Sequence, residues 1–247
     1  MSLEGKVAVI TGAARGMGQA FAVALAREGV DVAAVDILDC SETLGMIEAE
    51  GRKGLAISRD ISLPETALEV AQMVAEKLGP AHILVNNAGL HPQPTALEDL
   101  KFDYWRKVMA VNLDAMFLFI QAFLPQLRGH GWGRSVNISS SSANAAPPNG
   151  APYVSSKAGV LGLTRAVATE VGKYDITCNA IAPNPVRTPG AEVIPEDAFQ
   201  AVAAMQPIAR VMEPKDVCGA LVFLCGDGSE FITGQHIHVD GGFVRGD

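Results

Sequence analysis

Length, composition and charge already limit what this chain can be. It has 247 residues, of which 49% are hydrophobic and 19% charged, so it has enough apolar material for a large packed core. The formal net charge is −8 and no run of Lys or Arg occurs, which argues against a nucleic-acid or anionic-membrane surface. Neither a signal-peptide pattern nor a long uninterrupted apolar stretch is found, and the four Cys and five His show no metal-binding spacing. We therefore expect a soluble, cytoplasmic protein without a metal site or a membrane or nucleic-acid partner.

Short apolar runs alternate with amphipathic helical stretches along the whole chain. Runs rich in Val, Ile and Ala predict strands at residues 6–11, 30–36, 53–60, 82–89, 133–140, 175–183 and 234–242. Helical periodicity predicts helices at about 16–29, 41–50, 64–78, 101–128, 152–173 and 214–226. Strands separated by helices form βαβ units, whose right-handed crossovers favour a doubly wound, mostly parallel seven-stranded α/β sheet with helices on both faces. Because no linker divides the chain, we expect one dinucleotide-binding and catalytic domain over residues 1–247.

Residues 184–213 interrupt this alternation. The segment contains four prolines and one short helical stretch, at 196–205, and it follows the sixth predicted strand. In an open parallel sheet, ligands bind beyond the carboxyl ends of the strands. The segment is therefore predicted to be a substrate loop.

The turn between the first strand and the first helix reads TGAARGMG, with glycines at positions 12, 16 and 18. A turn without Cβ atoms lets the backbone approach a pyrophosphate, whose charge the helix N-terminus favours. Asp36 ends the second strand, where its carboxylate can accept both ribose hydroxyls of an adenosine and repel a 2′-phosphate. Arg15 points the other way, since a basic residue in the turn could contact such a phosphate. We give more weight to Asp36 and expect NAD as cofactor.

Tyr153 and Lys157 lie four residues apart in a predicted helix, so their side chains share one face. This spacing is also common on exposed helix surfaces. A functional site requires the ammonium to lower the pKa of the tyrosine so that it can act as acid or base. It also requires a donor for the substrate oxygen, which the run of four serines at 139–142 can supply from the carboxyl end of the fifth strand.

These motifs together resemble the short-chain dehydrogenase/reductase family over essentially the whole chain. The residues that carry the resemblance are Thr11-Gly12-x-x-x-Gly16-x-Gly18, Asp60, Asn86-Asn87-Ala88-Gly89, Asn112, the serine run, Tyr153-x-x-x-Lys157 and Asp240-Gly241-Gly242. Each motif alone is weak evidence, but their order and spacing are specific.

The resemblance implies a role for each member of a catalytic set. Tyr153 is expected to be the acid/base, and Lys157 to lower its pKa and bind the nicotinamide ribose. Ser140, thirteen residues before the tyrosine, is expected to polarise the substrate oxygen, and Asn112 to hold a water that links Lys157 to solvent. Ser139 would then be the last buried residue of the strand, and the loop would begin at positions 141 and 142, with Ser142 facing the substrate.

The resemblance also implies which residues contact the dinucleotide. Asp60 and Ile61 are expected to meet the adenine, and Thr188 to reach the nicotinamide carboxamide. The expected cofactor-binding residues are Gly12, Arg15, Gly16, Met17, Gly18, Asp36, Ile37, Asp60, Ile61, Asn87, Ala88, Gly89, Tyr153, Lys157, Pro183, Val186 and Thr188. Because the family usually pairs its long apolar helices across a two-fold axis, we expect a homotetramer.

The sequence departs from the family pattern once. After the sixth strand the family commonly has Pro-Gly, whereas this chain has Pro183-Asn184-Pro185. An asparagine adds an acceptor and two donors, so Asn184 either reaches the substrate or stabilises a turn through its own backbone.

The leading hypothesis is an NAD-dependent dehydrogenase or reductase that acts on a small, secondary alcohol or ketone. Dehalogenation on the same fold would lack the nucleotide site and have arginine in place of the lysine, so the glycine turn, Asp36 and Lys157 argue against it. A non-catalytic NAD-binding regulator remains the alternative, although it would be expected to have lost part of the Ser-Tyr-Lys set.

Overall fold

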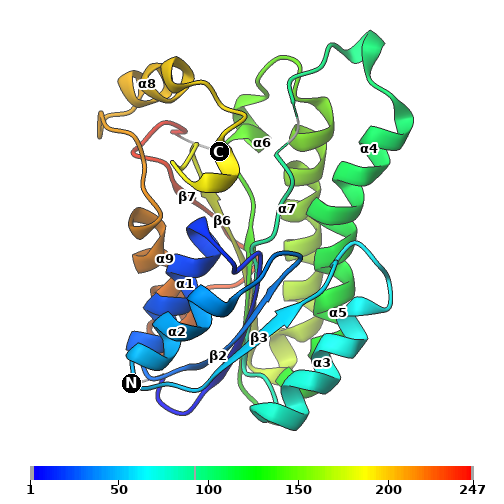
Figure 1. Ribbon diagram of the computed structural model, residues 1–247, viewed down its shortest axis with the longest axis vertical. Coiled ribbons are helices and arrows are strands. Elements are labelled where there is room, and N and C mark those ends of the chain that lie inside the picture. Colours follow the sequence, from blue (N-terminus) through cyan, green and yellow to red (C-terminus); the bar gives the residue numbers. More distant parts are fainter. Residues whose placement is uncertain (1–2, 92, 246–247) are drawn as a thin grey trace.

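The fold is built around one parallel sheet, seen in a computed structural model that describes residues 3–91 and 93–245 (Figure 1). The strands are β1 (Val7–Thr11), β2 (Asp31–Asp36), β3 (Gly54–Ser58), β4 (Ile83–Asn86), β5 (Gly133–Ile138), β6 (Ile176–Pro183) and β7 (His236–Val239). They lie in the order β3-β2-β1-β4-β5-β6-β7, and every neighbouring pair is parallel. The predicted doubly wound α/β fold is confirmed.

Helices cover both faces of the sheet (Figure 1). One face is covered by α1 (Gly16–Arg27), α2 (Ser41–Ala49) and α9 (Lys215–Cys225), and the other by α3 (Thr66–Lys77), α5 (Ala115–Gly129) and α7 (Ala151–Val171). Two further helices, α6 (Ser142–Ala145) and α8 (Glu196–Met205), follow the carboxyl ends of β5 and β6. Short 3₁₀ turns occur at Leu97–Asp99, Gly172–Tyr174, Pro189–Ala191 and Asp227–Ser229.

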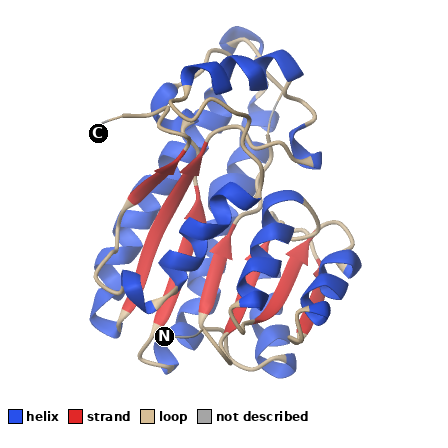
Figure 2. Cartoon of the chain, turned by 90° about the vertical axis from the view of Figure 1, so that its left-hand side faces the viewer, coloured by secondary structure: helices blue, strands red, loops and turns tan. Residues whose placement is uncertain are grey.

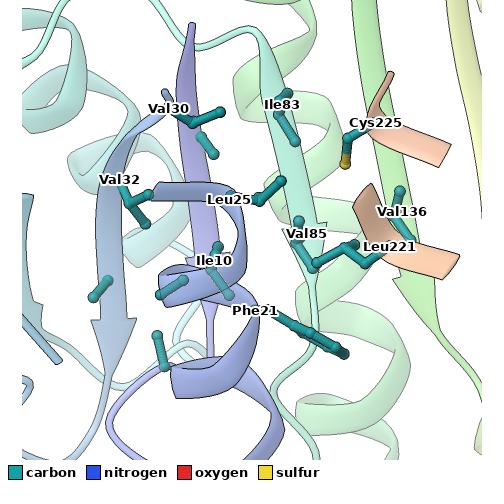
Figure 3. Packing of buried hydrophobic residues seen from close by; sticks show 14 of the residues in the cluster. Ile10, Phe21, Leu25, Val30, Val32, Ile83, Val85, Val136, Leu221 and Cys225 are labelled. Atoms are coloured by element: carbon teal, nitrogen blue, oxygen red, sulfur yellow. The ribbon is translucent and has the colours of Figure 1, made fainter. Parts of the chain in front are cut away.

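The apolar core lies between the sheet and these helices. Phe21 and Leu25 of α1 and Leu221 of α9 are fully buried against strand residues such as Ile10 and Val85 (Figure 3). Burying such a side chain contributes about 1.5–3 kcal/mol. A second cluster, centred on Phe119 and Phe123, fills the opposite face. These two apolar layers fix the strand register and so the positions of the turns that follow each strand.

The long helix predicted at 101–128 differs from the structure in one respect. It is divided into α4 (Phe102–Met109) and α5 by a π-helical turn over Ala110–Asp114. Such turns often occur at functional sites. Apolar residues occur at most positions on both sides of the turn, so the sequence pattern could not show it.

The whole segment Phe102–Gly129 is long and apolar enough for a membrane span by length and composition, with a window of mean hydropathy 1.7, of which 39% is buried.

The strands all point toward the end of the molecule at which α8 and the 184–213 segment lie (Figures 1 and 2). Residues 184–213 run from β6 to α9 across this end of the sheet, and α8 is the one α-helix within them. The base of the segment is closed by a bridge between Val186 and Met212 and by a hydrogen bond from the Arg187 N–H to the Met212 carbonyl. The segment is therefore placed over the edge at which parallel sheets bind ligands.

Candidate functional site

A cleft of about 720 Å³ opens at the carboxyl edge of the sheet. The strand order reverses between β1 and β4, and the turns after these two strands line the cleft. Every residue predicted to bind the dinucleotide or substrate or to catalyse lines it, except Gly18 and Asn112, which are buried behind its wall. The structure thus brings together, in one cavity, residues that lie more than a hundred positions apart in the sequence.

The glycine turn is shaped by two close backbone approaches. A Cβ on Gly18 would lie 2.0 Å from the Gly12 carbonyl oxygen, and a Cβ on Gly12 would lie 2.7 Å from the Ala88 Cα. Gly12 also has a φ of +67°, which favours glycine. No side chain caps the N-terminus of α1. The turn therefore offers bare backbone and the positive end of a helix dipole, which suit a pyrophosphate.

Asn87 and Thr11 join the glycine turn to the turn after β4. The Asn87 side-chain amide donates to the carbonyls of Thr11 and Gly12, at 2.9 and 3.1 Å. In return, the Thr11 hydroxyl accepts the backbone N–H groups of Asn87 and Ala88. These four bonds hold the two sides of the cleft at a fixed separation. Asn87 and Gly12, which belong to two separate predicted motifs, are thus directly hydrogen-bonded and have a structural role together.

The far end of the cleft from Tyr153 carries opposing charges. Asp36 accepts the backbone N–H groups of Ala14 and Leu38, each at 3.0 Å, so its carboxylate already holds the glycine turn. Arg15 is exposed, and its side chain makes no ion pair or hydrogen bond with any residue that the structure describes. Arg59, which the sequence analysis did not select, also lines the cleft and is bonded to Glu69 and to its own strand. Its position in the sequence, directly after the predicted third strand, could have indicated that Arg59 lies near Asp36 in the cleft.

The other end of the cleft contains the predicted catalytic set. Tyr153 lies in the first turn of α7, and its side chain interacts with that of Ser140, which follows β5. Burial raises the pKa of Tyr153, and the interaction with Ser140 offsets part of that rise. The lowering expected from Lys157 is not observed, because burial outweighs the other influences. The phenol is therefore held in its protonated, proton-donating form.

Lys157 is buried and clamped between α7 and β5. Its ammonium donates to the Ile138 carbonyl at 2.8 Å, while the Ser139 hydroxyl donates to the Lys157 carbonyl at 3.0 Å. The ammonium lies 5.7 Å from the centroid of the Tyr153 ring. Burial lowers the pKa of Lys157 to about 8. A reciprocal pair of bonds thus fixes the helix turn that carries Tyr153.

Asn112 lies inside the π-helical turn and holds backbone rather than lining the cleft. Its side chain accepts the Leu90 N–H at 2.7 Å and donates to the Leu90 carbonyl and to Ser156, both at 3.1 Å. Ser156 in turn donates to the Tyr153 carbonyl. Both amide hydrogens are occupied, so only the second lone pair of Oδ1 remains for the expected water.

The four serines have four different environments. The Ser139 hydroxyl donates to the Lys157 carbonyl, Ser140 lies beside Tyr153 and accepts the Ser142 N–H, and Ser142 lines the cleft. Ser139 was expected to be the last buried residue and position 141 to begin the loop, but Ser140 and Ser141 are buried too, and the Ser141 hydroxyl donates to Asn184. The expected loop begins instead with the short helix α6, which keeps position 141 inside the protein.

Of the two expectations for Asn184, a turn held through its own backbone is wrong, and a contact with the substrate stays a prediction. The side chain is buried, accepts from Ser141, and donates to Gln206 at 3.1 Å and to the Asp240 carbonyl at 3.0 Å. Both amide hydrogens are therefore used by distant parts of the chain, and no bond to its own backbone forms. An isolated sequence could not show which distant groups would meet this amide.

One further residue at the catalytic end was not selected from the sequence. His91 lines the cleft, and its ring centroid is 4.7 Å from that of Tyr153. It follows the Asn-Asn-Ala-Gly motif by two positions, at the carboxyl end of β4, and that placement was the only signal available.

Comparisons with known proteins agree with this site. Residues 12–244 match the family described as enoyl-(acyl carrier protein) reductase. The 3-oxoacyl-[acyl-carrier-protein] reductase FabG of Thermotoga maritima is 37% identical, over 99% of this chain and 100% of its own. The carveol dehydrogenase of Mycobacterium avium, solved with NAD, superimposes with a TM-score of 0.91 at 30% identity and 98% coverage of both chains. A Beutenbergia cavernae protein with bound NADP at low occupancy superimposes with a TM-score of 0.92 at 36% identity and 98% coverage of both chains.

The fold and the cleft define a dinucleotide-binding oxidoreductase of the Rossmann type. With these matches over nearly its whole length, the chain belongs to the short-chain dehydrogenase/reductase family, whose members act on small molecules with a nicotinamide dinucleotide. The predicted family and the nicotinamide cofactor class are confirmed. The bare glycine turn and the Asp36 carboxylate at the end of the cleft fit such a cofactor.

The glycine turn generates the first prediction. Gly18→Ala should weaken dinucleotide binding at least ~10-fold, because the new methyl would lie 2.0 Å from the Gly12 oxygen and the turn must shift. Isothermal titration calorimetry measures the change. Gly45→Ala in α2 is the matched control, since a Cβ at that position would have nothing within 4 Å. A folded Gly18→Ala protein that binds the dinucleotide as tightly as the control would contradict this role of the turn.

Proposed function

We propose that this protein is an NAD-dependent dehydrogenase or reductase that interconverts a small secondary alcohol and its ketone. The observation that carries the proposal is that Tyr153, Ser140 and the clamped Lys157 lie together at one end of the cleft whose other end suits a dinucleotide. When bound, the cofactor supplies the group that accepts or donates the hydride. The residues of the chain supply positioning and proton transfer.

The proton step falls to Tyr153. In reduction, the substrate carbon gains a hydride and its oxygen gains the phenolic proton, and in oxidation both leave. The Ser140 side chain lines the cleft beside Tyr153, and its hydroxyl can donate to the substrate oxygen. Because burial raises the pKa of Tyr153, the resting phenol is the acid form that ketone reduction uses.

The alternative, a non-catalytic NAD-binding regulator, would need none of these contacts. Tyr153→Phe removes the phenolic hydroxyl proposed to exchange the proton and should lower kcat by at least ~10², with dinucleotide binding retained. NADH formation or consumption over a panel of secondary alcohols and ketones measures the change. Tyr174→Phe, at a half-buried position in the 3₁₀ turn after α7 and outside the cleft, is the matched control. Full turnover in Tyr153→Phe would rule out the proposed mechanism.

The choice of NAD over NADP is proposed from Asp36. Its carboxylate lies at the end of the cleft, where it can accept from ribose hydroxyls and repel a 2′-phosphate. Arg15 favours the phosphate, but it is exposed and its charge is screened by solvent. Arg59 is already engaged by Glu69. The carboxylate, held in place by two backbone N–H groups, is the more rigid of these groups.

Asp36→Asn tests this choice, since it keeps the size of the side chain and removes the charge. The affinity for NAD should fall roughly ten- to a hundredfold and the relative use of NADP should rise, because hydrogen bonds to an ionised acceptor contribute ~1.5–3 kcal/mol. Steady-state kinetics with both cofactors measures the shift. Asp39→Asn, outside the cleft, controls for loss of charge nearby. An unmodified enzyme that prefers NADP would show that Arg15 outweighs Asp36.

We further propose that the protein is a soluble, cytoplasmic homotetramer. The outer surface of α5 and α7 carries an apolar groove, and Phe117 in it is 49% exposed. The groove is lined by Pro64, Leu113, Asp114, Phe117, Leu118, Gly159 and Leu163. Exposed apolar surface of this kind marks interfaces, and a two-fold axis through it would cover the apolar side of the long helix.

Phe117→Arg places a charge in this groove and should break the assembly. Analytical ultracentrifugation at micromolar concentration should show a tetramer for the unmodified protein and smaller species for the variant. Leu68→Arg, on the exposed side of α3, is the control, since it adds the same charge outside the groove. A single 25.9 kDa species for the unmodified protein would contradict the proposed assembly.

A further inference from the structure

Asn184 lies where the 184–213 segment leaves the sheet, and it joins three parts of the chain. Its side chain accepts from Ser141 after β5 and donates to Gln206 at the end of α8 and to the Asp240 carbonyl after β7. It is only 4% exposed, so these bonds are shielded from water. A buried amide with all its donors used is strongly held, because breaking any one bond leaves a desolvated polar group.

Gln206 extends this connection along the 184–213 segment. Its side-chain nitrogen donates to the carbonyls of Ile208 and Arg210, at 3.1 and 3.0 Å, while its oxygen accepts from Asn184. The Ile208 N–H donates to the Gly241 carbonyl. The end of the segment is therefore tied to its own beginning and to the loop after β7.

The loop after β7 packs closely against Gln206 and Pro207 of the 184–213 segment. A Cβ on Gly241 would lie 2.9 Å from the Gln206 side-chain nitrogen, and one on Gly242 would lie 3.0 Å from Pro207. The Asp240 carboxylate accepts the N–H groups of the residues at 242, 243 and 244, which holds the loop in its turn. The close approach shows that segment and loop are packed together, with the Asp240 carbonyl directed at Asn184.

The third arm of the connection reaches the catalytic end of the cleft. Ser141, which donates to Asn184, directly follows Ser140, the partner of Tyr153. The Ser141 N–H also donates to the Pro183 carbonyl, directly before Asn184. Displacing Asn184 would therefore release the serine turn on one side and the 184–213 segment on the other. Residues 183–194 supply much of the cleft wall on that side.

We propose that Asn184 is a positioning residue that holds the 184–213 segment closed at its base and the serine turn in place, so that the substrate end of the cleft is preformed. It acts through Ser141, Gln206 and Asp240 and does not touch the substrate. The proposal rests on the proposed function only for its effect on kinetics, whereas the tie itself is a property of the fold.

Asn184→Gly removes the whole side chain and tests both parts. Hydrogen–deuterium exchange of the peptide that contains Ile208 should become at least ~10-fold faster. The Ile208 N–H donates to the Gly241 carbonyl, and this contact loses the support of the Asn184 amide on Gln206 and Asp240. KM for the alcohol or ketone should rise about tenfold, while the dissociation constant for the dinucleotide changes by less than about twofold.

Two further variants separate positioning from general stability. Gln206→Met keeps the volume but removes both polar groups, and it should speed the same exchange. In the double variant Asn184→Gly/Gln206→Met, exchange should be little faster than in either single variant, since both substitutions break the same Asn184–Gln206 hydrogen bond. Asn179→Ala is the matched control: Asn179 is buried in β6, the strand that Asn184 follows, and its side chain binds the Ile232 carbonyl and the Gln235 N–H rather than the 184–213 segment. It should lower the melting temperature without changing exchange at Ile208 or KM.

The outcomes distinguish this inference from the proposed function. If Asn184→Gly matches Asn179→Ala in stability but leaves exchange at Ile208 and KM unchanged, Asn184 is a structural residue only and the inference is overturned. If exchange accelerates in Asn184→Gly and Gln206→Met while the unmodified protein oxidises no alcohol and reduces no ketone, the tie stands and the proposed function fails.

Discussion

The buried ammonium of Lys157 constrains the rest of the structure. An ammonium that leaves water needs a partner, and here the Ile138 carbonyl at the end of β5 supplies one at 2.8 Å. The Ser139 hydroxyl, at the end of the strand, donates to the Lys157 carbonyl in the helix and forms the second bond of the pair. Because a carbonyl of the last strand residue is available only at the carboxyl end of the sheet, α7 must begin there, and Tyr153 is carried to the same edge. The position of the turn that carries Tyr153 thus follows from satisfying one buried charge.

The rest of the cleft follows from strand order. The chain turns in opposite directions after β1 and β4, so their turns separate and leave a gap between them. Asn87 and Thr11 bridge the base of that gap, and the glycine turn forms one wall of it. On the catalytic side, Asn112 holds the Leu90 backbone and connects through Ser156 to α7. Thr11, Asn87 and Asn112 at this edge therefore each support another part of the chain.

Sequence reasoning predicted the parts of the structure that depend on local pattern. The strands and helices follow from apolar periodicity, and the glycine turn, Asp36, Tyr153 and Lys157 follow from spacing relative to those elements. The π-helical turn at 110–114 could not be predicted, because residues 108–120 are apolar at most positions and the shift in phase caused by an extra residue is hidden. The burial of Ser141 and the three partners of Asn184 also could not be predicted, because they depend on contacts between positions 43, 22 and 56 residues apart.

The central claim is that the clamp formed by Lys157 positions Tyr153 for proton transfer between a substrate oxygen and the protein. The most direct test is the pH dependence of NADH formation from secondary alcohols by the unmodified protein and by Lys157→Met, which keeps much of the side-chain volume without the charge. The account predicts that the rate of the unmodified protein rises with pH through an ionisation, and that the variant loses at least ~10² in kcat at every pH while staying folded. A folded variant with the turnover and pH profile of the unmodified protein would contradict it.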